Sequence, residues 1–472
     1  MNCKMIDSAY ILNHPVLYKH TSLLEKLKKT FLPEDEIFFL KAPGRINLIG
    51  EHTDYNMGPV LPCAIDKEII FVIRKNQNGE IFATNINGNF KDIRFSIARL
   101  IEPYPPGHWG NYIKAGIKGI VDYLKLQNPS VKENYIGFDI IVSSTLPIAA
   151  GLSSSSALVV AAAYSFVFMN HIDLDKTKLA EICANAEHFV GTAGGGMDHA
   201  TSLFGKKDAF LKIEFNPLRI ETIRVPTGIR LVLFHSLIEA EKSGRVRDEY
   251  NRRVLECRIG VDLFNNFMKI RSKDEFYPIE YIGEIRFEKL NLEALKLEQQ
   301  VKNFISQLKD SYSIYDISLL LNLSESELSA RYQSILHEKQ LNEPSDGFKI
   351  KGRFRHVITE CQRVERMVAC LESGNLHEIG ELLNASQQSL SRDYNVSTSE
   401  LDNLITILLD NGVAGARLMG AGFGGMVLAY LETEDLPVLI QKIEAAYYSR
   451  FTNIDASQYI FPCIVADGAG LV

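Results

Sequence analysis

Hydrophobic and polar residues follow two alternating patterns in the first half of the chain. Short runs rich in β-branched and aromatic residues predict strands over residues 37–41, 68–74, 80–84, 136–142, 209–215 and 230–234. A run of small apolar residues predicts a buried helix over 154–169, and apolar residues at helical spacing predict another over 174–189. The alternation predicts an α+β fold with mixed β-sheets and helices, and not a regular βαβ array.

The pattern changes in the second half of the chain. The alternation loosens near Asn216 and Pro217, so we place a boundary there between an N-terminal domain, residues 1–216, and a C-terminal domain, residues 217–472. Residues from about 272 to 352 are charged and rich in short helical signals, which predicts a helical insertion containing a hairpin over 316–332. Beyond it we expect helices over 356–372 and 401–411 and a strand over 426–431.

Composition and charge exclude several classes of protein. The 51 Lys and Arg residues against 58 Asp and Glu residues give a net charge of −7, so the chain lacks a general positive field for nucleic acid or an anionic membrane. The seven scattered cysteines contain no C-x-x-C pair, which argues against a disulfide framework or zinc ribbon. Without a bilayer-length apolar run or a signal-peptide pattern, we expect a cytoplasmic protein with no membrane or nucleic-acid partner.

The first segment with candidate chemistry is APGRINLIGEHTDYN, residues 42–56. Pro43 and Gly44 predict a turn at the end of the preceding strand. Four polar or charged side chains follow within ten residues, namely Arg45, Glu51, His52 and Asp54. They suit a polyhydroxylated ligand, because carboxylates accept hydrogen bonds from hydroxyl groups in pairs. A solvated turn with an ion pair is the alternative interpretation.

The second segment is LPIAAGLSSSSALVVAAA, residues 146–163, in which a Gly/Ser turn joins a strand to a helix. Exposed backbone N–H groups and the positive end of the helix dipole favour phosphate there, and the hydroxyl groups can add a Mg²⁺ ligand. An ordinary serine cap is the alternative, although four consecutive serines exceed what a cap needs. The chain contains no GxxxxGK[ST], which excludes a P-loop NTPase.

The third segment is GARLMGAGFGGMVLAY, residues 415–430, whose glycines match GxGxxG. A dinucleotide-binding fold needs a helix after the glycines, whereas this sequence continues as a strand. The lysine, catalytic loop and DFG of a protein kinase do not follow either. We therefore expect a backbone loop that packs closely against a ligand or another loop.

Asp198 follows a glycine cluster, residues 191–196, and lies eleven residues after Glu187. Glycines without Cβ atoms would allow this carboxylate to approach a substrate closely. A turn or a helix cap is the alternative interpretation of an Asp after glycines.

These segments, in this order, resemble the motifs of the GHMP kinases and, within them, of the galactokinases. PGRINLIGEHTDYN is similar to the galactokinase signature, LPIAAGLSSSSALV to the superfamily's phosphate loop and GARLMGAGFGGMV to its third motif. The resemblance extends to GHWGNYIKA, GGGMD, DEYNRRVLEC and RDYNVS, and covers most of the chain outside the insertion. It implies a two-domain GHMP kinase fold with the active site in the cleft between the domains. We expect a monomer whose partners are a small-molecule sugar and ATP.

The resemblance implies ATP-dependent phosphorylation of galactose at the C1 hydroxyl, which gives galactose 1-phosphate and ADP. Asp198 is the implied base and Arg45 its electrostatic partner. The implied sugar-binding residues are Glu51, His52, Asp54, Gly195 and Tyr250. The implied ATP-binding residues are Trp109, Tyr112, Gly151, Leu152, Ser153, Ser154, Ser155 and Ser156. Ser155 and Glu187 are the implied ligands of Mg²⁺, which prefers such hard oxygens.

The sequence departs from the usual galactokinase pattern at Ser156, His199, Met419 and Met426, where Ala, Gln, Thr and Cys are common. His199 beside the candidate base leaves room for an altered sugar preference or pH response. Two other functions stay open: an N-acetylgalactosamine kinase, since the long insertion resembles the larger, eukaryote-like members, and a catalytically idle sugar sensor. The Asp54–Tyr55–Asn56 run and Tyr250 favour galactose. The uninterrupted run over 153–157, with Asp198 and Arg45, favours an active enzyme.

Overall fold

The structure, a computed structural model, describes residues 14, 17–32, 35–97, 100–129, 135–147, 150–191, 194–239, 245–271, 277–286, 292–335, 341–432, 435–452 and 454–472. Parts of three predicted features lie outside these residues: positions 148–149 before the serine turn, positions 192–193 of the glycine cluster, and several stretches of the insertion.

The chain forms two compact units that alternate along the sequence. Unit 1 comprises Met1–Ile46, Pro62–Leu211 and Ile464–Val472, and unit 2 comprises Asn47–Leu61 and Lys212–Cys463. The predicted domain limits, 1–216 and 217–472, divide the chain once. They do not provide for Asn47–Leu61 belonging to unit 2 or for Ile464–Val472 belonging to unit 1. These limits and the cleft between the domains stay predictions, because a compact unit is defined by contacts and a folding domain by autonomous stability.

Unit 1 is built on a six-stranded mixed sheet with the order β12-β1-β2-β5-β3-β4. β3 and β5 pair in parallel, whereas β2 with β5, β3 with β4 and β1 with β12 pair antiparallel. Ile69 to Ile73 of β2 are all buried, as expected for a strand covered on both faces. The strands are β1 (Ile37–Asn47), β2 (Pro62–Lys75), β3 (Glu80–Asn85), β4 (Ile93–Ser96), β5 (Phe138–Ser144) and β12 (Gly470–Leu471).

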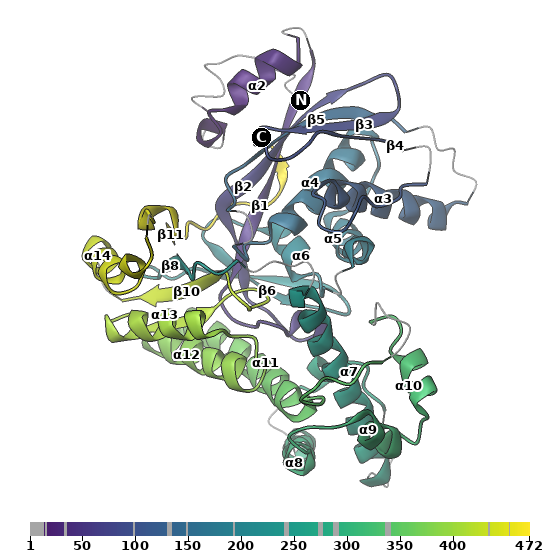
Figure 1. Ribbon diagram of the computed structural model, residues 1–472, viewed down its shortest axis with the longest axis vertical. Helices are drawn as coiled ribbons and strands as arrows, with labels where there is room; N and C mark the ends of the chain where they lie inside the picture. The colour runs from purple at the N-terminus through teal and green to yellow at the C-terminus, as the bar shows by residue number, and fades with distance from the viewer. Residues whose placement is uncertain are drawn as a thin grey trace. The chain divides into compact units, whose positions relative to one another are not determined.

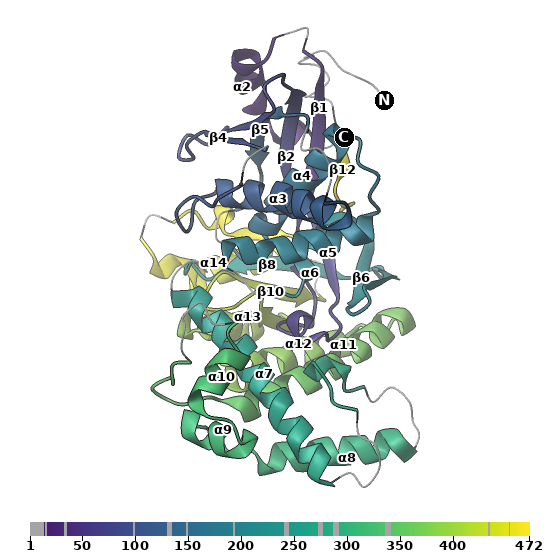
Figure 2. The ribbon, with the colours of Figure 1, turned by 90° about the vertical axis from the view of Figure 1, so that its right-hand side faces the viewer.

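Helices cover both faces of this sheet. In Figures 1 and 2, α3, α4 and α5 lie on one face and α2 on the other. Gly116 of α3 packs so closely on α4 that a Cβ atom would lie 2.4 Å from the Val159 carbonyl oxygen, which explains the small residues there. The helices are η1 (Leu17–Lys19), α2 (Leu23–Thr30), α3 (Gly110–Gln127), α4 (Ser154–Met169), α5 (Lys176–Ala186), η3 (Glu187–Val190) and α6 (Met197–Phe204).

Unit 2 combines a four-stranded antiparallel sheet, order β11-β8-β10-β9, with many helices. Figures 1 and 2 show α11, α12 and α13 side by side next to this sheet. The strands are β8 (Arg230–His235), β9 (Gly415–Leu418), β10 (Met426–Leu431) and β11 (Ile460–Pro462). β6 (Ala209–Glu214), within which the boundary of the units falls, and β7 (Arg219–Arg224) form a separate pair. The helices outside the insertion are η2 (Asp54–Asn56), α7 (Arg245–Arg271), α11 (Ile350–Ser373), α12 (His377–Arg392), α13 (Ser399–Asp410), α14 (Leu436–Ala446), η5 (Tyr448–Arg450) and η6 (Ala456–Gln458).

The described part of the insertion is helical: η4 (Ile282–Glu284), α8 (Leu292–Gln307), α9 (Ile314–Leu321) and α10 (Glu325–Arg331). α9 and α10 confirm the predicted hairpin, and each begins with a capping box, at Ser313 and at Ser324. Phe304 of α8 contacts Phe264 and Phe354, and the insertion shares one apolar cluster with the rest of unit 2. It therefore adds to the core of unit 2.

The predicted turn at Pro43 and Gly44 is wrong, because β1 continues through both residues to Asn47. Gly44 instead allows a close approach: a Cβ atom there would lie 2.7 Å from the Leu152 carbonyl oxygen and 2.4 Å from a methyl group of Leu146. The other predicted strands and helices are confirmed within the bounds above. The helices α2, α3, α6, α7, α12 and α14 and the strands β4, β7, β9, β11 and β12 are among the elements that were not predicted.

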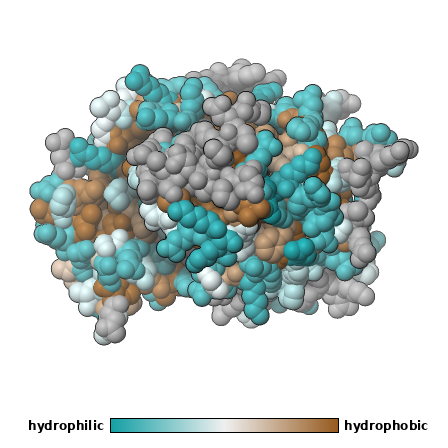
Figure 3. Space-filling model, turned by 90° about the horizontal axis from the view of Figure 1, so that it is seen from above, coloured by the Kyte–Doolittle hydropathy of each residue, from teal (hydrophilic) through white to brown (hydrophobic). Residues whose placement is uncertain are grey.

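The described surface is chemically mixed. In the face shown in Figure 3, hydrophilic residues surround smaller hydrophobic areas, as is usual for folded proteins. Among the described residues, no helix is both long and apolar enough to cross a bilayer.

Candidate active site

An arginine–aspartate pair stands at the centre of the site predicted in unit 1. Arg45 Nε lies 2.7 Å from Asp198 Oδ1, although 153 residues separate the two in sequence. Arg45 belongs to β1. Asp198 is the second residue of α6, a helix that begins directly after Gly196, whose φ is 99°. The Arg45 side chain is 4% exposed and that of Asp198 17%, so the carboxylate is the more accessible partner.

The serine turn before α4 also holds this carboxylate. Ser153 donates a hydrogen bond to Asp198 Oδ2, and Arg45 Nη1 donates one to the Gly151 carbonyl at 2.7 Å. Ser153 adopts φ 59° and makes no side-chain cap to its own helix. Because its hydroxyl group is directed to Asp198, the alternative of an ordinary serine cap does not describe Ser153.

The start of α4 supplies the features that favour phosphate. α4 is 16 residues long, and its first turn contains Ser154, Ser155 and Ser156 and no acidic residue. The partial positive charge and free N–H groups of such a helix end attract anions. Arg45 adds a fixed positive charge next to the same turn. The helix end thus offers local positive potential in a chain whose net charge is negative, whereas the charge of Arg45 is balanced by Asp198.

Glu187 brings a second carboxylate into unit 1, at the end of α5, and is 6% exposed. Its Oε1 accepts a hydrogen bond from Ser156 Oγ at 2.7 Å and lies 3.5 Å from Nε2 of the buried His199. Two of the four departures from the galactokinase pattern thus meet at one carboxylate oxygen.

The donor set at this position suits Mg²⁺. Among the described residues, no group of three or more His, Cys, Asp or Glu could hold a metal ion. The Ser155 hydroxyl and the Glu187 carboxylate offer hard oxygens, and Mg²⁺ usually completes its shell with waters and substrate phosphates. The residues present therefore fit this ion, and Ser155 and Glu187 stay its predicted ligands.

The remaining residues predicted in unit 1 lie at or near the starts of α3 and α6. Trp109 precedes α3 and donates from Nε1 to the Lys91 carbonyl at 2.9 Å. Burial, followed by the charge of Glu187, raises the pKa of Tyr112. Gly195 precedes α6, and a Cβ atom on its neighbour Gly194 would lie 3.1 Å from Glu187 Oε2. The adenine-side roles of Trp109 and Tyr112 stay predictions.

In unit 2, Glu51 connects the signature segment to the third glycine-rich segment. Glu51 is 2% exposed, and its Oε1 accepts hydrogen bonds from Gly420 N at 2.8 Å and Arg417 Nη2 at 3.2 Å. Arg417 also donates to the carbonyl oxygens of Asn47 and Leu48. The glycine loop thus packs against another loop, as one of the two interpretations of its sequence predicted.

His52 is the centre of an aromatic cluster in unit 2. It is buried in a left-handed backbone conformation, φ 64°, and its Nδ1 lies 2.8 Å from the Tyr55 hydroxyl oxygen. Its ring centroid lies 4.7 Å from that of Tyr394 and 5.7 Å from that of Tyr250. Burial is the largest cause that lowers the pKa of His52 well below its usual range. Asp54 follows in η2 and is 9% exposed.

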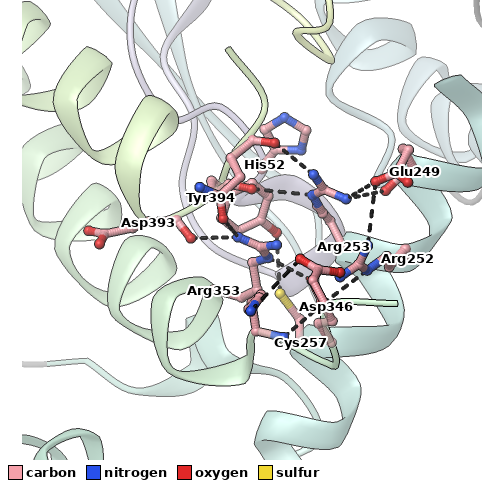
Figure 4. A network of polar contacts seen from close by, with 12 residues as sticks. His52, Glu249, Arg252, Arg253, Cys257, Asp346, Arg353, Asp393 and Tyr394 are labelled. Atoms are coloured by element: carbon pink, nitrogen blue, oxygen red, sulfur yellow. Dashed lines mark hydrogen bonds and ion pairs between the residues drawn. The ribbon is translucent and has the colours of Figure 1, made fainter. Parts of the chain in front are cut away.

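Sequence reasoning missed the residues that support this cluster. Figure 4 shows Arg353, Arg253 and their partners around Tyr394. Arg353 Nη1 donates to the Asp393 carbonyl at 2.6 Å, and Arg253 Nε donates to the Tyr394 carbonyl at 3.2 Å. The available signal was the occurrence of Arg253 in DEYNRRVLEC and of Tyr394 in RDYNVS, two segments already singled out.

Three family models match the chain in the order of the three motif segments. They are the galactokinase galactose-binding signature at residues 25–75, the GHMP kinases N-terminal domain at 111–206 and the GHMP kinases C-terminal model at 367–449. The residues described above, from Arg45 to the glycine loop, fall mostly within these matches.

Curated relatives and solved structures agree with these matches. A galactokinase of Dictyostelium discoideum is 30% identical over 487 aligned positions, which cover 96% of this chain and 94% of that protein. A galactokinase of Candida parapsilosis is 32% identical, with 92% and 90% covered. The structure of Lactococcus lactis galactokinase complexed with galactose has a similar fold, with a TM-score of 0.71, 23% identity, and 96% and 99% covered.

Proposed function

Because the chain belongs to the galactokinase family of the GHMP kinases, we propose that it transfers the γ-phosphoryl group of ATP to the C1 hydroxyl of galactose. The products are galactose 1-phosphate and ADP. The observation that carries this proposal is the Asp198 carboxylate, which Arg45 and Ser153 hold beside the helix end that favours phosphate.

Asp198 is the proposed base. Two donors fix the orientation of its carboxylate, and its partial exposure leaves room for a substrate hydroxyl group. The carboxylate takes the hydroxyl proton while the sugar oxygen attacks the γ-phosphorus. Arg45 offsets the negative charge of the transferring group, since phosphoryl transfer depends chiefly on positioning and charge.

The turn before α4 is the proposed phosphate site. Its members are Gly151, Leu152, Ser153, Ser154, Ser155 and Ser156, with Trp109 and Tyr112 on the adenine side. Ser155 and Glu187 would hold Mg²⁺, which supplies charge neutralisation at the ATP phosphates when bound. Ser156 orients the Glu187 carboxylate through the hydrogen bond described above.

The sugar-binding residues that we propose are Glu51, His52, Asp54, Gly195 and Tyr250. Carboxylates, an imidazole and a phenol together can pair with several hydroxyl groups, which suits a hexose. The matched galactose-binding signature supports galactose over N-acetylgalactosamine, and the Arg45–Asp198 pair supports an enzyme over an idle sensor. We further propose a cytoplasmic location, because the six cysteines among the described residues are all free thiols. The expectation of a monomer stays a prediction.

A coupled ADP-release assay with a panel of sugars tests this function. We expect kcat/KM to be highest for galactose, and ³¹P NMR of the product to show phosphorus coupled to the proton on C1. A higher kcat/KM for N-acetylgalactosamine would replace the proposed substrate. ADP release no faster than in the absence of sugar would favour the sensor.

A further inference from the structure

A chain of buried hydrogen-bonding groups leads from α7 to the signature segment in unit 2. Cys257 Sγ lies 3.2 Å from the Tyr394 hydroxyl oxygen, which lies 2.7 Å from that of Tyr55. The Tyr55 hydroxyl oxygen lies in turn 2.8 Å from His52 Nδ1. All four side chains are at most 5% exposed, so water does not compete for these contacts.

We infer that this chain of contacts holds His52 with its proton on Nε2, so that the signature segment presents a hydrogen-bond donor to its ligand. The naming of that ligand as a sugar rests on the proposed function. The position of the proton on His52 does not.

The four side chains in this series of contacts are neutral and together carry a fixed number of protons. Burial raises the pKa of Cys257 to about 11 and raises the pKa values of Tyr55 and Tyr394 well above their usual range. Burial likewise lowers the pKa of His52. Near neutral pH the thiol and both phenols therefore keep their protons, and the imidazole carries one proton, on either Nδ1 or Nε2.

Donor and acceptor strengths select between the two arrangements. In one, the thiol donates to Tyr394, Tyr394 donates to Tyr55, and Tyr55 donates to His52 Nδ1. In the other, every bond is reversed and a phenol donates to sulfur. Because an imidazole nitrogen is a much better acceptor than a thiol sulfur, the first arrangement matches the stronger donor with the stronger acceptor. It leaves the His52 proton on Nε2.

The surroundings of Nε2 agree with this assignment. Nε2 is buried, and no described residue makes a well-formed hydrogen bond with it. The backbone of Ala421 acts on the ring in the direction that favours an added proton, as a carbonyl near a ring N–H does. A proton on Nε2 is therefore compatible with the described neighbours of the ring, and a ligand oxygen can pair with it only where ligand binding uncovers this buried atom.

Two arginines hold the segment around Tyr394, in the middle of this series of contacts, in place. Arg253 Nη2 donates to the Asn395 carbonyl at 2.6 Å, and Arg353 Nη1 donates to Asn395 Oδ1 at 2.8 Å. Figure 4 shows these arginines close to Tyr394 and Cys257. Tyr55 and Tyr394 are thus positioning residues, because they act on a ligand only through His52.

Long-range ¹H–¹⁵N correlation of the side chains tests the assignment in the ligand-free protein. The chain has eleven histidines, so His52 is identified by the signal that disappears in His52→Asn. We expect Nδ1 to resonate as an unprotonated, pyridine-type nitrogen and Nε2 as a protonated, pyrrole-type nitrogen. A pyrrole-type Nδ1 overturns the inference, whatever the protein phosphorylates.

Tyr55→Phe tests whether the chain selects this form. We expect the variant to show a mixture of the two imidazole forms and a KM for galactose raised about tenfold, with kcat within about twofold of the native value. Tyr447→Phe is the matched control, because Tyr447 is equally buried and its hydroxyl donates to the Ser236 carbonyl at 2.8 Å.

The inference is overturned if Tyr55→Phe leaves the spectrum of His52 unchanged, or if Tyr447→Phe changes it as much. If Tyr55→Phe does not fold, the native spectrum alone decides the position of the proton. A native spectrum as expected together with no ADP release would retain the inference and reject the proposed function.

Discussion

Two arginine–carboxylate pairs, one in each unit, have nearly the same length and different surroundings. Arg45 Nε lies 2.7 Å from Asp198 Oδ1, and Arg353 Nε lies 2.6 Å from Glu256 Oε2. The Asp198 side chain is 17% exposed, whereas that of Glu256 is fully buried. The second oxygen of Glu256 is taken by Lys349 N at 2.9 Å and by Arg252 Nε at 3.2 Å.

The comparison shows that an ion pair does not define a role by itself. A buried pair whose carboxylate accepts several protein hydrogen bonds contributes to specifying the fold, and breaking it is costly. A pair with one accessible carboxylate can offer that oxygen to a substrate. Exposure of the carboxylate therefore separates the pair proposed for catalysis from the structural one.

The largest expected effect is that of Asp198→Asn on turnover. The amide keeps the shape of the side chain and cannot accept a proton, so kcat should fall at least about 10³-fold. Nucleotide affinity, measured by calorimetric titration, should change little. Asp208→Asn, on an exposed residue of the same unit, is the control and should retain full activity. A nearly native kcat for Asp198→Asn would remove the proposed base.

Glu256→Gln should have the next largest effect, and on stability. It leaves the buried Arg353 without its counter-charge, which costs about 3–5 kcal/mol in the free energy of unfolding. The urea-unfolding midpoint measures this loss. Glu378→Gln removes the partner of the exposed Arg366 and should leave the midpoint unchanged. Equal midpoints for the two variants would contradict the distinction between buried and exposed pairs.

Glu68 differs from both carboxylates compared above. It is buried, and its paired cation, Lys19 Nζ, lies 4.0 Å from its Oε1. Burial raises its pKa from 4.5 to about 7. The folded state therefore keeps a proton that the unfolded state has lost, and stability falls as the pH rises from 4.5 to 7. The loss is at most on the order of 3 kcal/mol.

His20 has the opposite pH dependence, because burial lowers its pKa from 6.5 to about 4. The unfolded state binds the extra proton between these values, so stability rises with pH there. In the native protein the two trends offset each other. Glu68→Gln should reveal the rise due to His20, followed by a plateau above pH 6.5, in urea midpoints measured from about pH 4 to 8. Parallel profiles for the native protein and the variant would refute this balance.

The smallest effect is expected for Ser156→Ala, which removes a neutral donor from Glu187. Loss of one such hydrogen bond costs about 1 kcal/mol, so the Mg²⁺ concentration for half-maximal rate should rise about fivefold. Ser165→Ala on the same helix is the control, because the buried Ser165 hydroxyl has no partner among the described residues. A similar shift for both variants would argue against a specific role of Ser156.

Much of the local structure could be predicted because it depends on neighbouring residues. The predicted helix over 154–169 coincides with α4, since a long run of small apolar residues has few other buried arrangements. α7 was missed, because Arg253 and Glu256 make its sequence appear exposed although pairing buries both residues. Pro43 and Gly44 were misjudged for a related reason: their residue types favour a turn, and packing against Leu152 overrides that preference.

The sequence by itself determined the order of the three motif segments, the α+β class and the identity of the candidate groups, because these depend on residue type and spacing. Only the tertiary structure decided which groups meet. It joined Ser153 and Arg45 to Asp198, directed Ser156 to Glu187 and placed Tyr55 and Tyr394 in line with His52. Such pairings link residues up to 339 positions apart, and no local pattern encodes a distance across the core.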